Sequence, residues 1–589
     1  MIPVARPRTR RLTVIAQDPS IRVKGRVLTT EVEIPAEEIA PGPRGYRVQV
    51  VDYDTSSGVL YQPRAYPPLQ SGQYLDPFKE DAERPNNDSL VTDPRFHEQN
   101  VYAIVMKTLA RFEFALGRRI SWGFPGHQIN VAPHAFADAN AFYSKHDQAL
   151  VFGYFKGLSG QVIFSCLSHD VVAHETTHAI LDGLRNRYTD PSSPEQAGFH
   201  EGFSDVVALL SVFSLTEVVA TLLQPKVGKK KKGESDLIDP DELTIEKLRD
   251  SVLLGLAKQM GSEMEGVRGN RAHALRRSVK LRPLTDKDDR KTYEKLEEFQ
   301  EPHRRGEILV AAMLNAFLQV FRARIDKLER GRPGANLDLK LVVEQGADAA
   351  DQLLTMAIRA LDYAPPTDLQ FRDYLSALIT ADRELVPDDG KYQYRKILLK
   401  SFRDYGIEPA SFNSPDGSWE ACNAHLTYDR SHFESMMRDP DEVFRFIWEN
   451  REELKLEEHA YTKVTSVRPC LRIGPDGFAL RETVVEYIQM VTLQAQELQS
   501  FDPPIGKPEG MSPDEEVTLY GGASLIFDEY GRLKYQILNR INNSSLQTPR
   551  LKYLWKYGYF ADKDTEENLF ARLHLSRALN LTRNVAERF

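Results

Sequence analysis

Two histidines and a glutamate in one short segment have the types and spacing of a metal site. His174 and His178 are four residues apart in the run His-Glu-Thr-Thr-His, and Glu175 lies between them. On an α-helix, residues four apart project from nearly the same face, so two imidazoles can bind one ion. Neutral imidazole suits zinc, and a catalytic zinc keeps three protein ligands and one open position for water. The segment therefore predicts a water activated by zinc, with Glu175 as its general base.

The alternative for this segment is a pair of surface histidines on an amphipathic helix. The neighbours Val171, Val172 and Ile180 argue against it, because they predict a helix buried on several faces. Imidazoles without partners would be costly in such a place. The apolar neighbours therefore favour the metal site.

A second pair of acidic residues supplies the third ligand. Glu201 and Asp205, in the run Phe-His-Glu-Gly-Phe-Ser-Asp, are again four residues apart and share a helix face. We expect Glu201 to bind the metal and Asp205 to orient a ligating imidazole through its other ring nitrogen. Taken alone, both would be solvated helix charges, but the apolar run after Asp205 predicts a core helix.

These two segments resemble a known family. His-Glu-x-x-His followed by Glu-Gly-x-Ser-Asp is similar to the zinc metallopeptidases of the thermolysin and fungalysin type, the gluzincins. The resemblance implies Zn²⁺ as the cofactor, bound by His174, His178 and Glu201. It extends over residues 95–405 and does not cover the flanking parts of the chain.

Further segments resemble the substrate-binding parts of the same family. Asn140 and Ala141 are similar to its edge strand, in which the asparagine side chain and the alanine backbone hold the extended substrate. His303, in Pro-His-Arg-Arg-Gly-Glu, resembles the histidine that stabilises the tetrahedral oxyanion. Tyr188 lies near the position of an oxyanion-binding tyrosine, and Arg276 resembles an arginine that contacts a substrate carbonyl.

Two of these assignments have alternatives. Arg277, next to Arg276, is the other candidate for the arginine. Either Glu298 or Glu301 is expected to orient His303.

The other histidines and the cysteines give weaker signals. Of His134, His146, His200 and His273, only His200 adjoins a proposed ligand, and we expect supporting or solvent-exposed roles for all four. Cys166 lies in an apolar segment and is interpreted as a small core residue. The three cysteines are widely spaced and form no CxxC pair, which disfavours both a disulfide scaffold and a thiolate zinc site.

Composition places the chain among ordinary globular proteins. Of 589 residues, 41% are hydrophobic and 27% charged, which excludes disordered and collagen-like classes. A net charge of −9 gives no reason to expect nucleic acid or an anionic membrane as a partner. Residues 206–223 approach membrane-spanning length, but serine, threonine and glutamate interrupt them, so a buried core helix is expected. We expect a cytoplasmic protein, with signal-independent export as the alternative.

The pattern of apolar residues predicts an α+β fold. Strands are expected at 26–33, 46–53, 128–132 and 149–155, and helices at 100–117, 170–187, 198–224, 243–260, 306–330, 338–362, 369–384 and 440–455. Two hairpins are predicted to turn at 475–477 and 528–531.

Three domains are expected. A β-rich N-terminal domain occupies 1–88 and an α+β C-terminal domain of unknown role occupies 408–589. Between them, at 89–407, the resemblance implies a thermolysin-like peptidase core with an N-terminal mixed α/β lobe that carries the active-site helix and a C-terminal, mainly helical lobe.

The expected function is that of a zinc metalloendopeptidase acting on a protein or peptide substrate. A zinc exopeptidase and a zinc-retaining scaffold protein without turnover are the alternatives. The expected partners include no nucleic acid and no membrane. We also expect the flanking parts or a regulatory partner to restrain proteolysis, and the sequence leaves the oligomeric state open.

Overall fold

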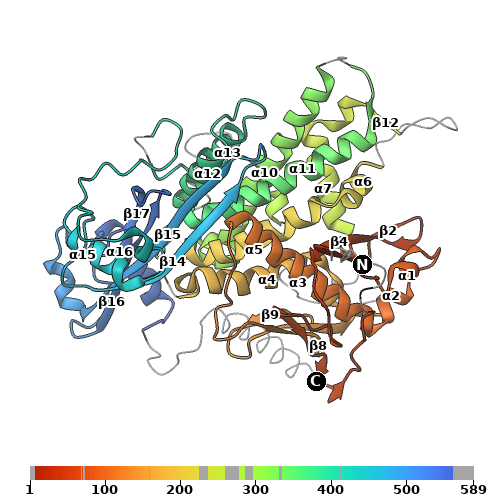
Figure 1. Ribbon diagram of the computed structural model, residues 1–589, viewed down its shortest axis with the longest axis horizontal. Helices are drawn as coiled ribbons and strands as arrows, with labels where there is room; N and C mark the ends of the chain where they lie inside the picture. The colour runs from red at the N-terminus through yellow and green to blue at the C-terminus, as the bar shows by residue number, and fades with distance from the viewer. Residues whose placement is uncertain are drawn as a thin grey trace, which may run out of the picture.

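The protein has the mixed α+β architecture expected from its sequence (Figure 1). The computed structural model describes residues 7–67, 69, 73–157, 160–190, 192–224, 236–258, 277–284, 293, 296–330, 334–411 and 414–560. In Figure 1 the blue C-terminal sheet lies at the left, the first N-terminal strands lie at the right, and most of the yellow and green helices lie at the upper right, above those strands.

A five-stranded sheet lies beside the helices that carry the predicted metal ligands. Its strands are β5 (Val48–Val50), β8 (Ile129–Phe136), β9 (Ala141–Ser144), β10 (Ala149–Lys156) and β11 (Val162–Phe164). The first two and β10 run parallel in the order β10-β8-β5, whereas β9 and β11 pair antiparallel with β10. Among the described strands β9 pairs with β10 alone, so it lies at the edge of the sheet.

The sheet and the hydrophobic core both cross the domain limit predicted at residue 88. β5 lies before that residue and pairs with β8, which lies after it. A second sheet, formed by β1 (Thr9–Ile15) and β4 (Thr29–Pro35), packs on α3 (Pro94–Leu116), and both belong to the main hydrophobic cluster. The shorter elements of this region are β2 (Arg22–Val23), β3 (Arg26–Val27), β6 (Tyr53–Asp54), β7 (Val59–Leu60), α1 (Lys79–Glu83) and α2 (Ser89–Thr92).

Helices form the middle of the molecule. The main described helices between the two sheets in chain order are α4 (His169–Leu184), α5 (Pro194–Phe213), α6 (Thr216–Leu223), α7 (Ile245–Lys258), α10 (Pro302–Glu329), α11 (Leu339–Arg359), α12 (Phe371–Leu385) and α13 (Tyr394–Arg403). The single helix predicted at 198–224 is instead α5 followed by α6, and the chain bends by 78° between them. Sequence analysis did not predict α13.

One described helix, α10, is long and apolar enough to cross a membrane, and the bent pair α5–α6 would be a second if it formed one span. In α10, 83% of the apolar window is buried inside the protein. This helix therefore serves as a core helix of the fold.

The C-terminal region is built on a four-stranded antiparallel sheet. Its strands follow one another in chain order: β14 (Tyr461–Ile473), β15 (Ala479–Gln494), β16 (Glu516–Phe527) and β17 (Leu533–Asn539). This order confirms both predicted hairpins. The helices of the region are α14 (Phe433–Met436), α15 (Pro440–Glu449) and α16 (Ser544–Lys556), so the helix predicted at 440–455 ends earlier than expected.

A network of buried charges joins this sheet to the helices. Arg472 on β14 donates to Asp362 and to Glu482, each at 2.5 Å. Arg118 donates to both oxygens of Asp362, at 2.5 and 2.6 Å. Burial acts to raise the pKa of Asp362, but Arg118 and Arg472 outweigh it and hold that pKa well below its usual range. The carboxylate thus stays ionised between two guanidinium groups.

A second buried ion pair ties the end of α4 to the same sheet. Arg185 directly follows α4 and is 2% exposed. It donates to Glu486 of β15 and to the carbonyl oxygen of Leu361. Arg468 of β14 donates to the same oxygen of Glu486 at 2.8 Å. The helix that carries the two histidines is therefore anchored at its C-terminal end by the C-terminal sheet.

Candidate metal centre

Three buried side chains converge in the arrangement that the sequence predicts for a metal site. α4 provides His174 and His178, α5 provides Glu201, and their donor atoms all lie within 4.8 Å of one another. Oε2 of Glu201 lies 3.6 Å from Nε2 of His174 and 3.9 Å from Nε2 of His178. Two donors on one tetrahedral zinc at ordinary bond lengths are about 3.4 Å apart. The two histidines and the glutamate therefore fit zinc in both donor type and spacing.

Neighbouring side chains orient both imidazoles toward this point. Nδ1 of His174 lies 2.8 Å from Oδ1 of Asp205. Nδ1 of His178 lies 2.8 Å from Nδ1 of His200 and 3.2 Å from the hydroxyl of Ser204. Partners that accept the Nδ1 proton leave the lone pair on Nε2, the nitrogen that faces the glutamate. The supporting contacts therefore favour the tautomer that a metal needs.

The helix α4 is buried, as its apolar neighbours predict. Glu175, Thr176 and Thr177 are all 0% exposed. The two threonine hydroxyls donate to carbonyl oxygens one turn back in the same helix, at 2.6 and 2.7 Å. The two hydroxyl protons are thus satisfied within the helix itself.

The start of α10 brings His303 close to the three predicted metal ligands, called the metal group below: His174, His178 and Glu201. Its Nε2 lies 3.3 Å from Oε2 of Glu201, and its Nδ1 lies 3.1 Å from Oε1 of Glu301. The other oxygen of Glu301 accepts a hydrogen bond from the backbone N–H of Arg304 at 2.9 Å and caps the helix. One carboxylate therefore both begins α10 and orients the histidine. Glu298, the other candidate, accepts from Arg304 at 2.9 Å instead.

Glycines allow α5 and α10 to cross in direct backbone contact. Gly202 follows Glu201, and Gly306 lies three residues after His303. A Cβ on Gly202 would lie 2.7 Å from the carbonyl oxygen of Gly306. A Cβ on Gly306 would lie 2.8 Å from the carbonyl oxygen of Gly198 and 2.9 Å from the nitrogen of Gly202. The absence of these Cβ atoms sets the short distance between the glutamate and His303.

Replacing Gly306 with alanine tests this crossing. Without a clash, glycine to alanine inside a helix stabilises by about 1 kcal/mol. Here the new methyl group meets backbone atoms, so we expect a loss of about 1–3 kcal/mol, the usual cost of overpacking. Thermal and denaturant unfolding measure the sign directly. A more stable variant would contradict the close crossing of the two helices.

The predicted substrate strand is fixed to α4. Asn140 precedes β9, and Ala141 is its first residue. From the same strand region, the hydroxyl of Tyr143 and the ammonium group of Lys145 each donate to Asp182 at 2.9 Å. Asp182 lies on α4, four residues after His178. Helical spacing places it on nearly the same face as that histidine, which is the sequence signal for this contact. The edge strand therefore has a set position relative to the metal group.

The oxyanion contact predicted for Tyr188 does not fall where the resemblance implies. Tyr188 is 1% exposed, and its hydroxyl donates to the carbonyl oxygen of Pro365 at 2.6 Å. Because that proton is donated to Pro365, the hydroxyl of Tyr188 is not available to an oxyanion. Arg276 lies outside the described residues. Arg277 donates to Glu307 of α10 at 2.7 Å, one turn beyond His303.

The remaining histidines lie in different places. His200 supports His178, as described above. The side chain of His146 is 95% exposed. His134 belongs to a separate buried cluster with His97, which sequence analysis did not single out. His273 lies outside the described residues.

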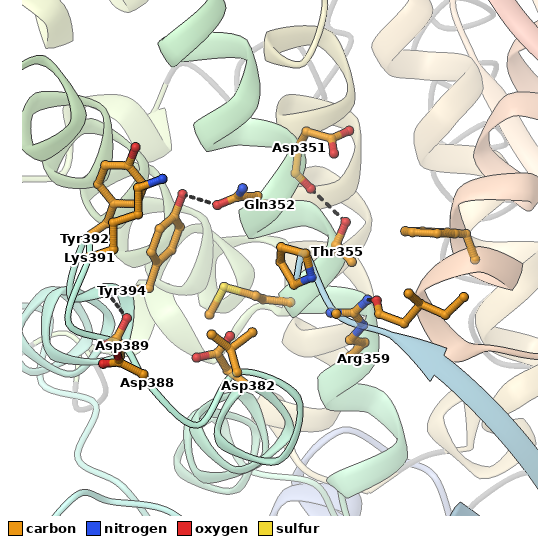
Figure 2. A pocket seen from close by; sticks show the side chains of 16 residues that line it. Asp351, Gln352, Thr355, Arg359, Asp382, Asp388, Asp389, Lys391, Tyr392 and Tyr394 are labelled. Atoms are coloured by element: carbon orange, nitrogen blue, oxygen red, sulfur yellow. Dashed lines mark hydrogen bonds between the residues drawn. The ribbon is translucent and has the colours of Figure 1, made fainter. Parts of the chain in front are cut away.

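A separate cavity of about 420 Å³ lies between the helices and the β14–β15 turn (Figure 2). None of the residues that line it belongs to the metal group. Arg359 donates to the carbonyl oxygens of Ala115 and Ile473, each at 3.1 Å. Tyr394 donates to Gln352 at 2.7 Å. Arg359 and Tyr394 therefore form hydrogen bonds with other parts of the protein.

Comparison with known proteins adds no relative. No protein-family model matches the chain, and no curated protein is similar to it in sequence. The case for a function therefore rests on the geometry of the site itself.

Proposed function

We propose that the chain is a zinc-dependent metallopeptidase, built on a thermolysin-like core, that hydrolyses internal peptide bonds. The convergence of His174, His178 and Glu201 carries the proposal. Glu175 lies on α4, the helix of the two histidines. The nearby imidazole of His303 and the edge strand β9 support it. A cytoplasmic location is part of the proposal, and the burial of α10 supports only that this helix does not cross a membrane.

The proposed reaction assigns one task to each group. Zinc, when bound by its three ligands, polarises the substrate carbonyl and lowers the pKa of a water molecule. An extended substrate adds to β9 beside Asn140 and Ala141, as a further strand of the sheet. Glu175 accepts a proton from the attacking water and passes it to the leaving nitrogen. His303, in the imidazolium form with its Nδ1 proton facing Glu301, donates a hydrogen bond through Nε2 to the oxygen that gains negative charge.

Replacing His178 with alanine tests the metal site. The variant loses one of three protein ligands, so we expect it to lose one equivalent of zinc relative to the wild type. Its affinity should fall by more than the about 10–100-fold seen when only a supporting group is lost. Elemental analysis after purification without chelators, and competition with a zinc chelator, give the stoichiometry and the affinity. His146→Ala, at a histidine whose side chain is 95% exposed, is the matched control and should keep its zinc.

The same preparations separate the possible activities. Digestion of an unstructured protein, followed by mass spectrometry, should give internal fragments with the wild type and none with His178→Ala. Release of terminal residues alone would indicate an exopeptidase. Bound zinc without any cleavage would indicate a scaffold. Zinc retained equally by His178→Ala and the wild type would refute the site.

A further inference from the structure

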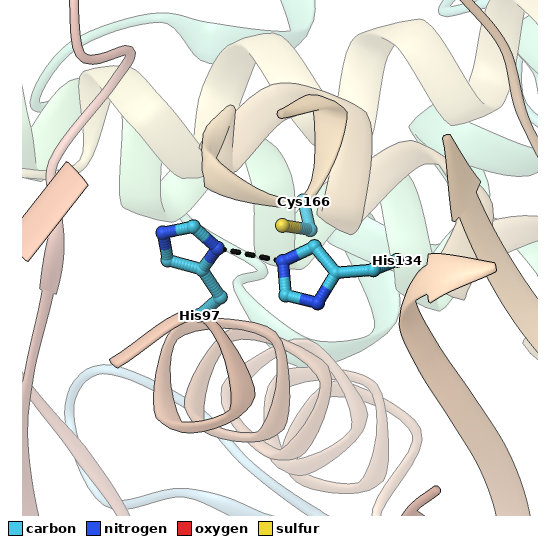
Figure 3. A group of neighbouring side chains, drawn as sticks. All are labelled: His97, His134 and Cys166. Atoms are coloured by element: carbon cyan, nitrogen blue, oxygen red, sulfur yellow. Dashed lines mark hydrogen bonds between the residues drawn. The ribbon is translucent and has the colours of Figure 1, made fainter. Parts of the chain in front are cut away.

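A second buried group of side chains that could hold a metal ion has its third member just before the start of α4 (Figure 3). It consists of His97 on α3, His134 on β8 and Cys166 in the short 3-10 helix η1 (Ser165–Leu167). Their donor atoms lie within 4.8 Å of one another. The three residues are 0%, 2% and 0% exposed, respectively. Figure 3 shows the thiol pointing toward the two facing rings.

The outer nitrogens of both rings face groups that accept hydrogen bonds. Nε2 of His97 lies 2.9 Å from the carbonyl oxygen of Val91. Nδ1 of His134 lies 2.8 and 3.0 Å from the two oxygens of Asp52. A carbonyl and an ionised carboxylate only accept, so the ring protons belong on these outer nitrogens.

The inner nitrogens then both carry lone pairs. Nδ1 of His97 and Nε2 of His134 lie 2.7 Å apart. Two lone pairs at this distance repel each other unless a cation lies between them. At 2.7 Å that cation is a proton shared by the rings, and a metal ion would replace it only with the rings farther apart. The thiol of Cys166 supplies a third donor, which a metal ion would use and a shared proton would not.

We infer that His97, His134 and Cys166 bind a second transition-metal ion, either zinc or copper. Imidazole suits both metals, and a thiolate selects zinc and monovalent copper among the common ions. The carboxylate of Asp52 behind His134 is the usual support for a ligating imidazole. Binding requires the two ring nitrogens to move apart to about 3.4 Å, the spacing of two donors on one ion.

The burial of this site argues against a catalytic ion, and its three donors are one fewer than the four of a usual structural zinc site. All three side chains are closed off from solvent, whereas a catalytic metal keeps an open position. The side-chain amide of Asn100, one turn after His97 on α3, donates to the carbonyl oxygen of Cys166 at 2.8 Å and holds η1 in place. Three residues after Cys166, α4 begins at His169. An ion here would pin α3, β8 and the start of the helix that carries the proposed catalytic ligands.

Cobalt substitution tests the thiolate directly. Cobalt bound by a thiolate has a charge-transfer absorption that cobalt bound by imidazole and carboxylate lacks. The cobalt-loaded full chain should therefore show this band, and Cys166→Ala should lose the band together with one equivalent of metal. Cys470→Ala, at another buried free cysteine, should keep both and is the matched control. His178→Ala should keep the thiolate band, so this test is independent of the proposed peptidase site.

X-ray absorption on the wild type needs no variant and so is unaffected by misfolding. In the zinc-loaded chain we expect a sulfur shell at about 2.3 Å from part of the zinc. Loading with monovalent copper under anaerobic conditions, in competition with zinc, identifies the preferred ion. If neither metal shows a sulfur ligand and Cys166→Ala binds as much metal as the wild type, the inference is wrong and the two rings share a proton.

Discussion

Replacing Glu175 with glutamine is expected to lower peptide hydrolysis by about 10²–10⁴-fold, the usual contribution of a general acid–base group. The amide has nearly the same shape as the carboxylate, and Glu175 is not one of the three proposed ligands. The fold and the bound zinc should therefore be kept, while the group can no longer accept a proton from water. The initial rate of cleavage of an internally quenched peptide and the zinc content, measured on the same sample, test both parts.

A half-exposed glutamate that is not part of the proposed site provides the matched control. Glu344 on α11 has a side chain that is 45% exposed and lies 4.0 Å from Lys340. The same substitution there should leave the rate unchanged. If Glu175→Gln cleaves as fast as Glu344→Gln, the proposed mechanism is wrong. If Glu175→Gln also loses zinc, the residue has a structural role that the proposal does not include.

Replacing Arg472 with methionine is expected to cost about 3–5 kcal/mol in the free energy of unfolding, the range seen when one partner of a buried ion pair is removed. Arg472 is 1% exposed and lies between Asp362 and Glu482. Methionine fills part of the space but leaves both carboxylates with one cation fewer. Denaturant unfolding followed by fluorescence and circular dichroism gives the change.

The control for this prediction is a solvent-exposed ion pair on the protein surface. Arg11 and Glu33 lie 2.7 Å apart, with side chains that are 67% and 46% exposed. Exposed pairs contribute about 0–1 kcal/mol, so Arg11→Met should unfold almost as the wild type does. Equal unfolding midpoints for Arg472→Met and Arg11→Met would show that the buried network does not stabilise the protein.

The proposed metal site could be predicted from the sequence because its signals are local. His174 and His178 lie one turn apart on one helix, and Glu201 and Asp205 repeat that spacing on the next. Helical periodicity alone therefore places each pair on one face. Both hairpins in the C-terminal sheet were predictable for a similar reason, since each turn is marked by glycine and aspartate between two apolar runs.

Contacts between distant elements left no such signal. His97 and His134 are 37 residues apart, and Arg472 and Asp362 are 110 apart. A charged residue has the same letter whether it is buried or exposed, so the ion network could not be foreseen. The break between α5 and α6 was missed because the apolar pattern continues through Leu215, whose partly buried side chain packs on the main core.

The ion pair at the end of α4 has a consequence for the order of events during protein synthesis. Arg185 and Glu486 are separated by 301 residues. At about 5–20 residues per second, a ribosome needs roughly 15–60 s to make the intervening chain. Throughout that interval the nascent chain contains both histidines, but the arginine that follows their helix lacks its carboxylate. The final anchor of the helix thus forms late in translation, when most of the protein has already left the ribosome.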